Sequence, residues 1–361
     1  MKKTNQKKQS KKKNVKISII LSIALSVVII FLIFLFSFDA SSLEYFSTVS
    51  VRYEFFVLAG LLNIITWIIW GIRLKVLSNA ISDKVSISTW KSIRIVITNL
   101  FLASITPSMA GGEPVRVYLL NKEGLSYGSA TASVISERLI DAVVILFLVP
   151  VAFYIMKEAI DVFFIQVALL IGVIFFIGVV LLFFYAIKRP EKTKSFLLFL
   201  NRKICRFFKK DMKKQSRIID RINTEVDNFH EGMMIFLEKN KKPFLIAGML
   251  TIMYWSVGFL IPSMLLLGLG MKPIFIESFA AQVLLVTIIM MPTTPGSSGT
   301  TELGVGGLYT LLIGSSIIGV FVLLFRLITY HMNLIAGAIF QYRIFKSVAS
   351  FSLETIKKKQ K

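Results

Sequence analysis

NLFLASITPSMAGGEPVRVYLLNKEGLSYGSATASVISERLID, residues 99–141, places charged side chains next to a Pro/Gly-rich break, inside a chain that is otherwise built of long apolar runs. Those that matter here are Glu113, Arg116, Glu137, Arg138 and Asp141. A charged side chain costs roughly 2.5–3.5 kcal/mol at the centre of a membrane helix, so such a cluster normally lines a polar cavity or a transport path. We therefore expect fold and function to be organised around this stretch.

The composition indicates an integral membrane protein. Of the 361 residues, 55% are hydrophobic, and apolar segments near the ~20 residues that cross a bilayer recur along the chain. Most of the net charge of +22 comes from lysines and arginines that flank these segments, which is the positive-inside pattern and excludes a nucleic-acid-binding class. Cys205 is the single cysteine, and His230 and His331 have no ligands at metal spacing, so neither a disulfide, a metal nor a cofactor is expected.

Three basic segments divide the chain and are expected on the cytoplasmic side, where they attract anionic membrane lipids. They are the tail 1–16, with eight lysines, the segment 188–243, with 16 basic and 7 acidic residues, and the tail 346–361. Between them lie two membrane halves, 17–187 and 244–345. The predicted location is the cytoplasmic membrane of a bacterium or archaeon, with both termini inside.

Six apolar runs are long enough to cross a bilayer, which predicts an all-α polytopic fold with six full spans. They are residues 17–38, 55–77, 128–155, 162–187, 244–267 and 315–342. Two further stretches, 93–120 and 274–314, are broken by Pro/Gly-rich segments into pieces too short to span, and each predicts a re-entrant hairpin of two half-helices. Arg73 is expected to snorkel to the interface, with Trp67 and Trp70 in the aromatic belt; a further role for Arg73 is the alternative.

The two breaks resemble each other. The first reads Thr106-Pro107-x₃-Gly111-Gly112-Glu113 and the second Thr294-Pro295-Gly296-x₂-Gly299-x₂-Glu302. With six spans, the hairpins enter from opposite sides and form an inverted repeat, as in many secondary transporters; similar composition alone is the alternative. The N-termini of half-helices suit phosphate, and Glu113 and Glu302 either cap these helices or bind substrate.

Charged residues also fall near the middle of two predicted spans. Glu137 and Asp141 share one helix face, so they either line a polar cavity or form a neutralised cluster with Arg138 that fixes helix packing. Arg326, about 15 Å into the last span, is too deep to snorkel. We expect Glu137, Asp141 or Glu302 within salt-bridge reach of Arg326, which has either a structural role or a phosphate-binding role.

These residues resemble the flippase-like membrane family that includes the transmembrane part of lysylphosphatidylglycerol synthase, the multiple peptide resistance factor. The matching features are the span around Asn99, the Pro-x₃-Gly-Gly-Glu-x₂-Arg run at 107–116, the Glu-Arg-x₂-Asp cluster at 137–141 and the break at 292–302. The resemblance covers residues 15–345. The chain stops soon after the last span. The resemblance therefore implies a lipid translocator that stands alone, without the synthase domain, and that is not an enzyme.

The expected substrate is a phospholipid, aminoacylated in some relatives, or a polyprenyl-phosphate-linked lipid. Two other classes stay open: an accessory subunit that docks a cytoplasmic glycosyltransferase on 188–243, and, least favoured, a membrane-embedded enzyme. A homo-oligomer also stays open. The predicted substrate-binding residues are Asn99, Gly111, Gly112, Glu113, Arg116, Glu137, Arg138, Asp141, Thr294, Gly296, Gly299, Glu302 and Arg326.

Overall fold

The computed structural model describes residues 50–82, 85–104, 106, 112–157, 163–207, 212–239, 241–289, 299–313 and 315–340, and in these ranges it contains helices and no strand. The all-α class is confirmed. The helices are α3 Tyr53–Ile81, α4 Thr89–Ser104, α5 Gly112–Lys122, α6 Tyr127–Met156, α7 Phe163–Lys188, α8 Pro190–Phe207, α9 Met212–Met234, α10 Lys241–Gly268, α11 Phe275–Ile289, α12 Thr300–Ile313 and α13 Ile318–Arg326, with π-helical segments η1 Ile235–Lys239 and η2 Leu327–His331.

Five helices of the described chain are long and apolar enough to cross a membrane. They are α3, α6, residues 169–188 of α7, α10, and the continuous helix 318–340 that contains α13 and η2. These five correspond to five of the six predicted spans. The predicted first span, 17–38, and the two basic tails lie outside the described residues.

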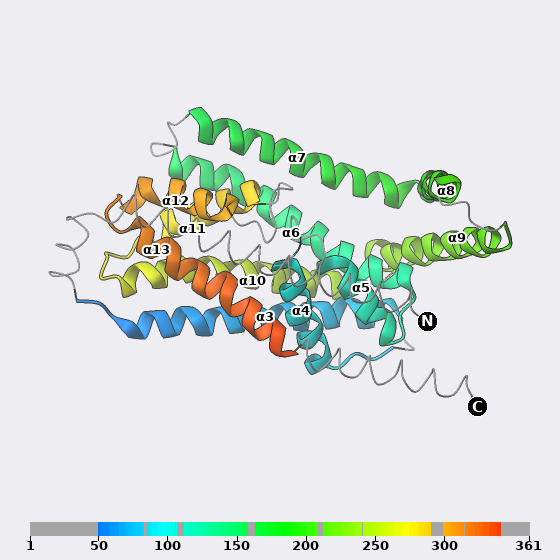
Figure 1. Ribbon diagram of the computed structural model, residues 1–361, viewed down its shortest axis with the longest axis horizontal. Helices are drawn as coiled ribbons and strands as arrows, with labels where there is room; N and C mark the ends of the chain where they lie inside the picture. The colour runs from blue at the N-terminus through cyan, green and yellow to red at the C-terminus, as the bar shows by residue number, and fades with distance from the viewer. Residues whose placement is uncertain are drawn as a thin grey trace, which may run out of the picture.

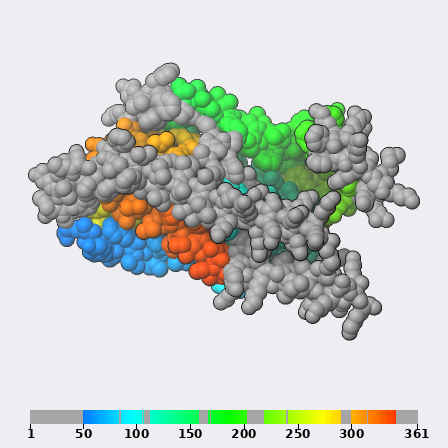
Figure 2. Space-filling view, viewed as in Figure 1, coloured from blue at the N-terminus to red at the C-terminus, as the bar shows by residue number. Residues whose placement is uncertain are grey.

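The long helices form a bundle in which α3 and α10 run antiparallel, side by side (Figure 1). The backbone N–H of Arg52 donates to the carbonyl of Gly268 at 2.9 Å, which joins the start of α3 to the end of α10. Helix α6 packs against both, whereas α7 lies along the edge of the molecule away from α3 (Figures 1 and 2). Many α7 side chains are exposed, as expected for a helix that faces lipid.

Two pairs of short helices fill the bundle, α4 with α5 and α11 with α12. The longest, α4, has 16 residues, or about 24 Å of helix, which is less than the ~30 Å hydrocarbon core. The two members of each pair contact one another. The pairs lie toward opposite ends of the bundle (Figure 1).

A short turn fixes how α5 leads into α6. Gly124 adopts a φ of 112°, a left-handed conformation that suits glycine after a helix end. The Asn121 side chain donates to the Leu125 carbonyl at 2.7 Å. Ser126 then caps α6, its hydroxyl accepting from the Ser129 N–H at 3.0 Å. The sequence NKEGLS therefore sets α6 beside α5, three turns before Glu137.

Gly112 allows α4 and α5 to approach closely. A Cβ on this residue would lie 2.4 Å from the side-chain oxygen of Asn99 and 3.3 Å from the Cβ of Ala103, so a larger residue would have to displace the Asn99 side chain. The structure thus brings together two predicted site residues, one from each side of the first break.

Candidate functional site

A buried ion-pair cluster joins α3, α5, α6 and α10, with Arg73 at its centre. The guanidinium of Arg73 donates to Asp141 at 2.6 Å and to the Thr251 hydroxyl at 2.8 Å. Its Nε also lies 3.4 Å from a carboxylate oxygen of Glu137. Arg73 and Glu137 are completely buried. A single arginine therefore connects both carboxylates of α6 to the neighbouring spans.

Two indoles complete the coordination of these carboxylates. Trp70 of α3 donates its Nε1–H to Glu137 at 3.2 Å, and Trp255 of α10 donates to Asp141 at 3.2 Å. Arg116 of α5 forms a further ion pair with Glu137. Each carboxylate thus accepts from groups on different helices, which is the condition for holding charge inside a membrane protein.

The outer part of the cluster contains Arg138 and Glu113. Arg138 lies 3.3 Å from Asp141 and 3.5 Å from Glu113, which in turn lies 3.8 Å from Arg116. Both Arg138 and Glu113 are partly exposed, in contrast to the fully buried Arg116. Three arginines therefore face three carboxylates without net charge. This geometry matches the neutralised-cluster alternative for residues 137–141.

The expectations for Arg73, Trp67 and Trp70 were wrong. All three are buried, because α3 continues about two turns beyond Arg73 to Ile81 and keeps them inside the bundle. A charge count offered a signal that sequence reasoning missed. Within the predicted hairpin 93–120 and the predicted span 128–155, the stretch 99–141 holds three acids but only two arginines, so a third cation was needed from elsewhere.

A second ion pair joins α12 to α13. The Nε of Arg326 lies 2.9 Å from Glu302, and both side chains are nearly inaccessible. The second oxygen of Glu302 accepts from the Gly299 N–H at 2.6 Å, so the carboxylate also caps α12. The guanidinium stacks 4.0 Å from the Tyr330 ring centre. The prediction that Arg326 lies within salt-bridge reach of a named carboxylate is confirmed; its phosphate role stays a prediction.

The two ion pairs have the same architecture. Glu113 and Glu302 each lie in the first turn of the second short helix of a pair. Each binds an arginine of the next long helix, 25 positions later in the first case (113 to 138) and 24 in the second (302 to 326). The similarity between the two breaks therefore extends to their ion-pair contacts.

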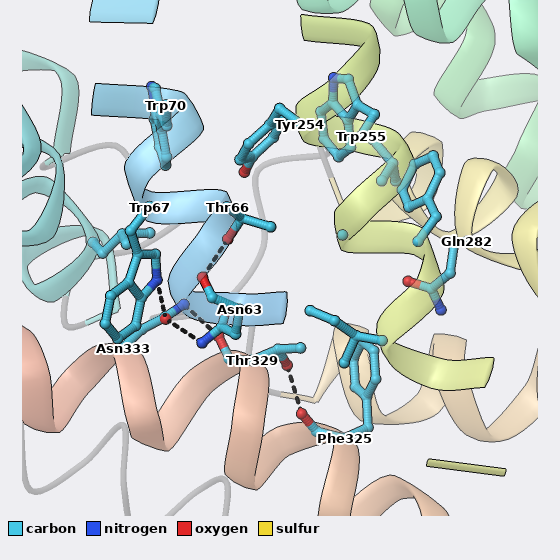
Figure 3. A pocket seen from close by; sticks show the side chains of 15 residues that line it. Asn63, Thr66, Trp67, Trp70, Tyr254, Trp255, Gln282, Phe325, Thr329 and Asn333 are labelled. Atoms are coloured by element: carbon cyan, nitrogen blue, oxygen red, sulfur yellow. Dashed lines mark hydrogen bonds between the residues drawn. The ribbon is translucent and has the colours of Figure 1, made fainter. Parts of the chain in front are cut away.

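A cavity of about 200 Å³ lies between the two halves of the chain (Figure 3). Helices α3 and α4 of the first half and α10, α11 and the 318–340 helix of the second half enclose it. Its lining residues are Asn63, Thr66, Trp67, Trp70, Leu100, Tyr254, Trp255, Gly258, Phe259, Ile261, Gln282, Val286, Phe325, Thr329 and Asn333.

Amide side chains organise one wall of the cavity. The Asn63 amide nitrogen donates to the Ile328 carbonyl at 2.9 Å and to the Asn333 oxygen at 3.0 Å, and Trp67 donates to the same oxygen at 2.9 Å (Figure 3). The Ile328 carbonyl belongs to η2, and π-helical segments are frequent at functional sites. The wall thus depends on the irregular segment of the last span.

Two tryptophan side chains belong to both the cavity wall and the ion-pair cluster. The indoles of Trp70 and Trp255 line the cavity, while their N–H groups donate to Glu137 and Asp141. None of the predicted site residues within the described ranges lines this cavity. Gly111, Thr294 and Gly296 lie outside the described residues. Sequence reasoning missed Asn63, Gln282 and Asn333 as residues of the cavity. Each is a polar amide inside an apolar run of the sequence, and this pattern could have identified them.

Comparison with known proteins finds relatives over most of the chain. A UPF0104 membrane protein of Archaeoglobus fulgidus is 33% identical over 318 residues, 87% of this chain and 94% of the relative. A UPF0104 membrane protein of Pyrococcus horikoshii is 25% identical over 307 residues, covering 83% and 90% of the two chains. No solved structure matches the chain. The profile of the lysylphosphatidylglycerol synthase TM region matches residues 19–337, and the chain therefore belongs to that family.

Proposed function

We propose that the protein translocates a lipid across the membrane, with the polar headgroup passing through the cavity between the two halves and the acyl tails remaining in the bilayer. The observation that carries this proposal is the cavity itself. Its wall contains three carboxamides and two threonines, contributed by helices that are otherwise apolar. Polar groups in such a position mark substrate pathways.

The two short-helix pairs support an inverted repeat of re-entrant hairpins with six spans. Their helices are too short to cross the bilayer, they lie toward opposite ends of the bundle, and their glutamate–arginine pairs correspond. Transporters with inverted repeats bind substrate near the midplane, where the halves meet. The cavity occupies such a boundary, because both halves contribute to its lining.

The chemistry of the cavity favours a headgroup that carries ammonium or hydroxyl groups. The amide nitrogens of Asn63, Gln282 and Asn333 all donate to protein partners. The side-chain oxygens of Asn63 and Gln282 are thereby left as acceptors for a bound molecule. The aromatic rings attract cations, and no charged residue is among the lining residues that the structure describes. A bare phosphate would find no cationic partner there.

The ion-pair cluster holds the cavity wall in place. Because Trp70 and Trp255 donate to buried carboxylates, their rings are fixed against the cavity from behind. The cluster has no net charge among its six members, so it creates no strong electrostatic well that would retain a headgroup. The charged residues thus lie in the ion-pair cluster, and the residues that line the cavity are uncharged. This arrangement suits transport of a headgroup rather than its tight binding.

Reconstitution with fluorescent lipids tests the proposal. Gly258 lines the cavity, and a Cβ added there would lie 3.9 Å from the Thr66 methyl, so Gly258→Phe would fill the cavity. Gly248→Phe on the same helix meets open space and serves as the control. We expect the wild type and Gly248→Phe to move acyl-labelled phosphatidylethanolamine and phosphatidylglycerol faster than phosphatidic acid. Gly258→Phe should abolish this movement.

Two outcomes would contradict the route. Unchanged lipid movement in a folded Gly258→Phe protein would exclude the cavity as the pathway. Absence of movement by the purified wild type, restored by a cytoplasmic partner, would support the accessory-subunit alternative. Monodisperse elution of each variant from size-exclusion chromatography controls for folding.

A further inference from the structure

A second cavity, of about 600 Å³, lies away from the central one, between the start of α6, the end of α7, and helices α8 and α9. Its lining is mostly apolar and includes Phe183, Leu197, Ile222, Val226 and Phe229. Its size falls within the roughly 300–1,000 Å³ of small-molecule sites. The translocation route described above does not use it.

The apolar lining continues onto the exposed face of α8. Phe196 and Phe199 of this helix are 59% and 54% exposed, and Leu197 belongs to both the cavity and this face. On the neighbouring end of α7, Leu181 and Leu182 are also largely exposed. An amphipathic helix with aromatic residues on its apolar face, next to a lipid-facing span, is typical of the membrane interface. The apolar lining of the cavity therefore continues to the outer surface of the molecule beside α7 and α8.

Arg221 of α9 is a positively charged residue that lines the cavity. Its guanidinium lies 5.1 Å from the ring centre of Tyr127, and it forms no ion pair with a residue that the structure describes. The nearby Glu225 accepts from the Gly128 N–H at 2.6 Å and is already used in joining α9 to α6. An anionic group would satisfy Arg221.

One neighbouring cation, Lys194, is committed to structure. Lys194 of α8 lies 2.8 Å from Asp227 of α9 and 3.0 Å from Glu191. These hydrogen bonds raise the pKa of Lys194 above its ordinary value, so the ammonium stays charged while it fastens α8 to α9. Lys194 is therefore held by protein carboxylates, whereas Arg221 is the cation among the lining residues of the cavity.

We infer that this cavity binds one molecule of an anionic phospholipid from the leaflet beside segment 188–243, with an acyl chain among the apolar side chains and the phosphate on Arg221. Charge complementarity supports this occupant, because the segment contains 16 basic and 7 acidic residues. The continuous apolar path from α8 provides the entry. The bound lipid would brace α8 and α9 against the spans.

Photocrosslinking in nanodiscs tests this inference. Phosphatidylglycerol and phosphatidylcholine, each with a diazirine on one acyl chain, would be compared for labelling of the peptides that contain residues 218–229. We expect phosphatidylglycerol to label them more strongly. Arg221→Gln should lower this labelling about fivefold, as for the loss of one cationic contact with an anionic lipid. Lys192→Gln, on an exposed site of α8 outside the cavity, removes the same charge and should leave labelling unchanged.

Ile222→Trp provides an independent steric test, because it fills the cavity without changing charge. We expect it to remove labelling of residues 218–229 by both lipids. Equal labelling by the two lipids, equal effects of Arg221→Gln and Lys192→Gln, or full labelling of a folded Ile222→Trp protein would overturn the inference. So would occupation of the cavity by a protein or by a second copy of the chain, detected as a crosslinked complex.

Discussion

Replacing Arg326 with methionine separates a structural role from a phosphate-binding role at the second ion pair. Methionine has a similar length and no charge, so the change leaves the carboxylate of Glu302 buried next to an apolar side chain. Glu302 is inaccessible to solvent. Removing one partner of a buried ion pair typically costs about 3–5 kcal/mol. We expect Arg326→Met to lower the free energy of unfolding by this amount.

A second substitution should reverse most of that loss. Glu302→Gln removes the negative charge, while the amide oxygen still accepts from the Gly299 N–H that the carboxylate now binds at 2.6 Å. The stacking of Arg326 on Tyr330 is not recovered, and cation–π contacts contribute about 0.5–2 kcal/mol. The double variant should therefore remain roughly this much less stable than the wild type.

Equilibrium unfolding in mixed micelles, titrated with SDS and followed by helicity, measures these differences. The four proteins of the cycle are the wild type, the two single variants and the double variant. Stability of Arg326→Met equal to that of the wild type, combined with loss of lipid translocation, would refute the structural account and favour phosphate binding. Failure of the double variant to exceed Arg326→Met in stability would also contradict the reasoning.

Two further predictions concern packing and topology. Gly112→Ala should destabilise the protein by about 1–3 kcal/mol in the same assay, because its Cβ would meet Asn99, whereas Gly306→Ala, with open space around it, should be nearly neutral. A cysteine at Gly270 should react with an impermeant thiol reagent from outside intact cells and one at Ser216 should not; reaction of Ser216 from outside would exclude the proposed inverted repeat.

Much of the fold follows from apolar length. The run 55–77 predicted the span that the structure places at Tyr53–Ile81, and the break within 93–120 predicted two short helices, which the structure places at Thr89–Ser104 and Gly112–Lys122. Hydropathy predicts that a span exists more reliably than it predicts where the span begins and ends. A helix continues as long as its backbone hydrogen bonds form and its side chains find partners. At its C-terminal end α3 runs four residues beyond the predicted span, to Ile81, and Arg73 is buried in the bundle.

The site was predictable only in part. Charged residues near Pro/Gly breaks are visible in one dimension, and Glu113, Arg116, Glu137, Arg138 and Asp141 do converge. The cavity is different, because its amides come from α3, α11 and the last span, more than 200 positions apart at the extremes. Their convergence depends on how the two halves pack, which a single sequence does not encode in any local pattern.

The most direct test of the proposed route uses the tryptophans of the cavity. Three of the four in the chain line it, and the fourth, Trp90, is 58% exposed, so Trp90→Phe leaves a fluorescence signal that comes from the cavity alone. A phosphatidylethanolamine with a nitroxide on its headgroup should quench this signal saturably and more strongly than one labelled at the end of its acyl chain, and Gly258→Phe should remove the difference. Equal quenching by the two lipids, or quenching by the headgroup label that persists in Gly258→Phe, would contradict passage of the headgroup through the cavity.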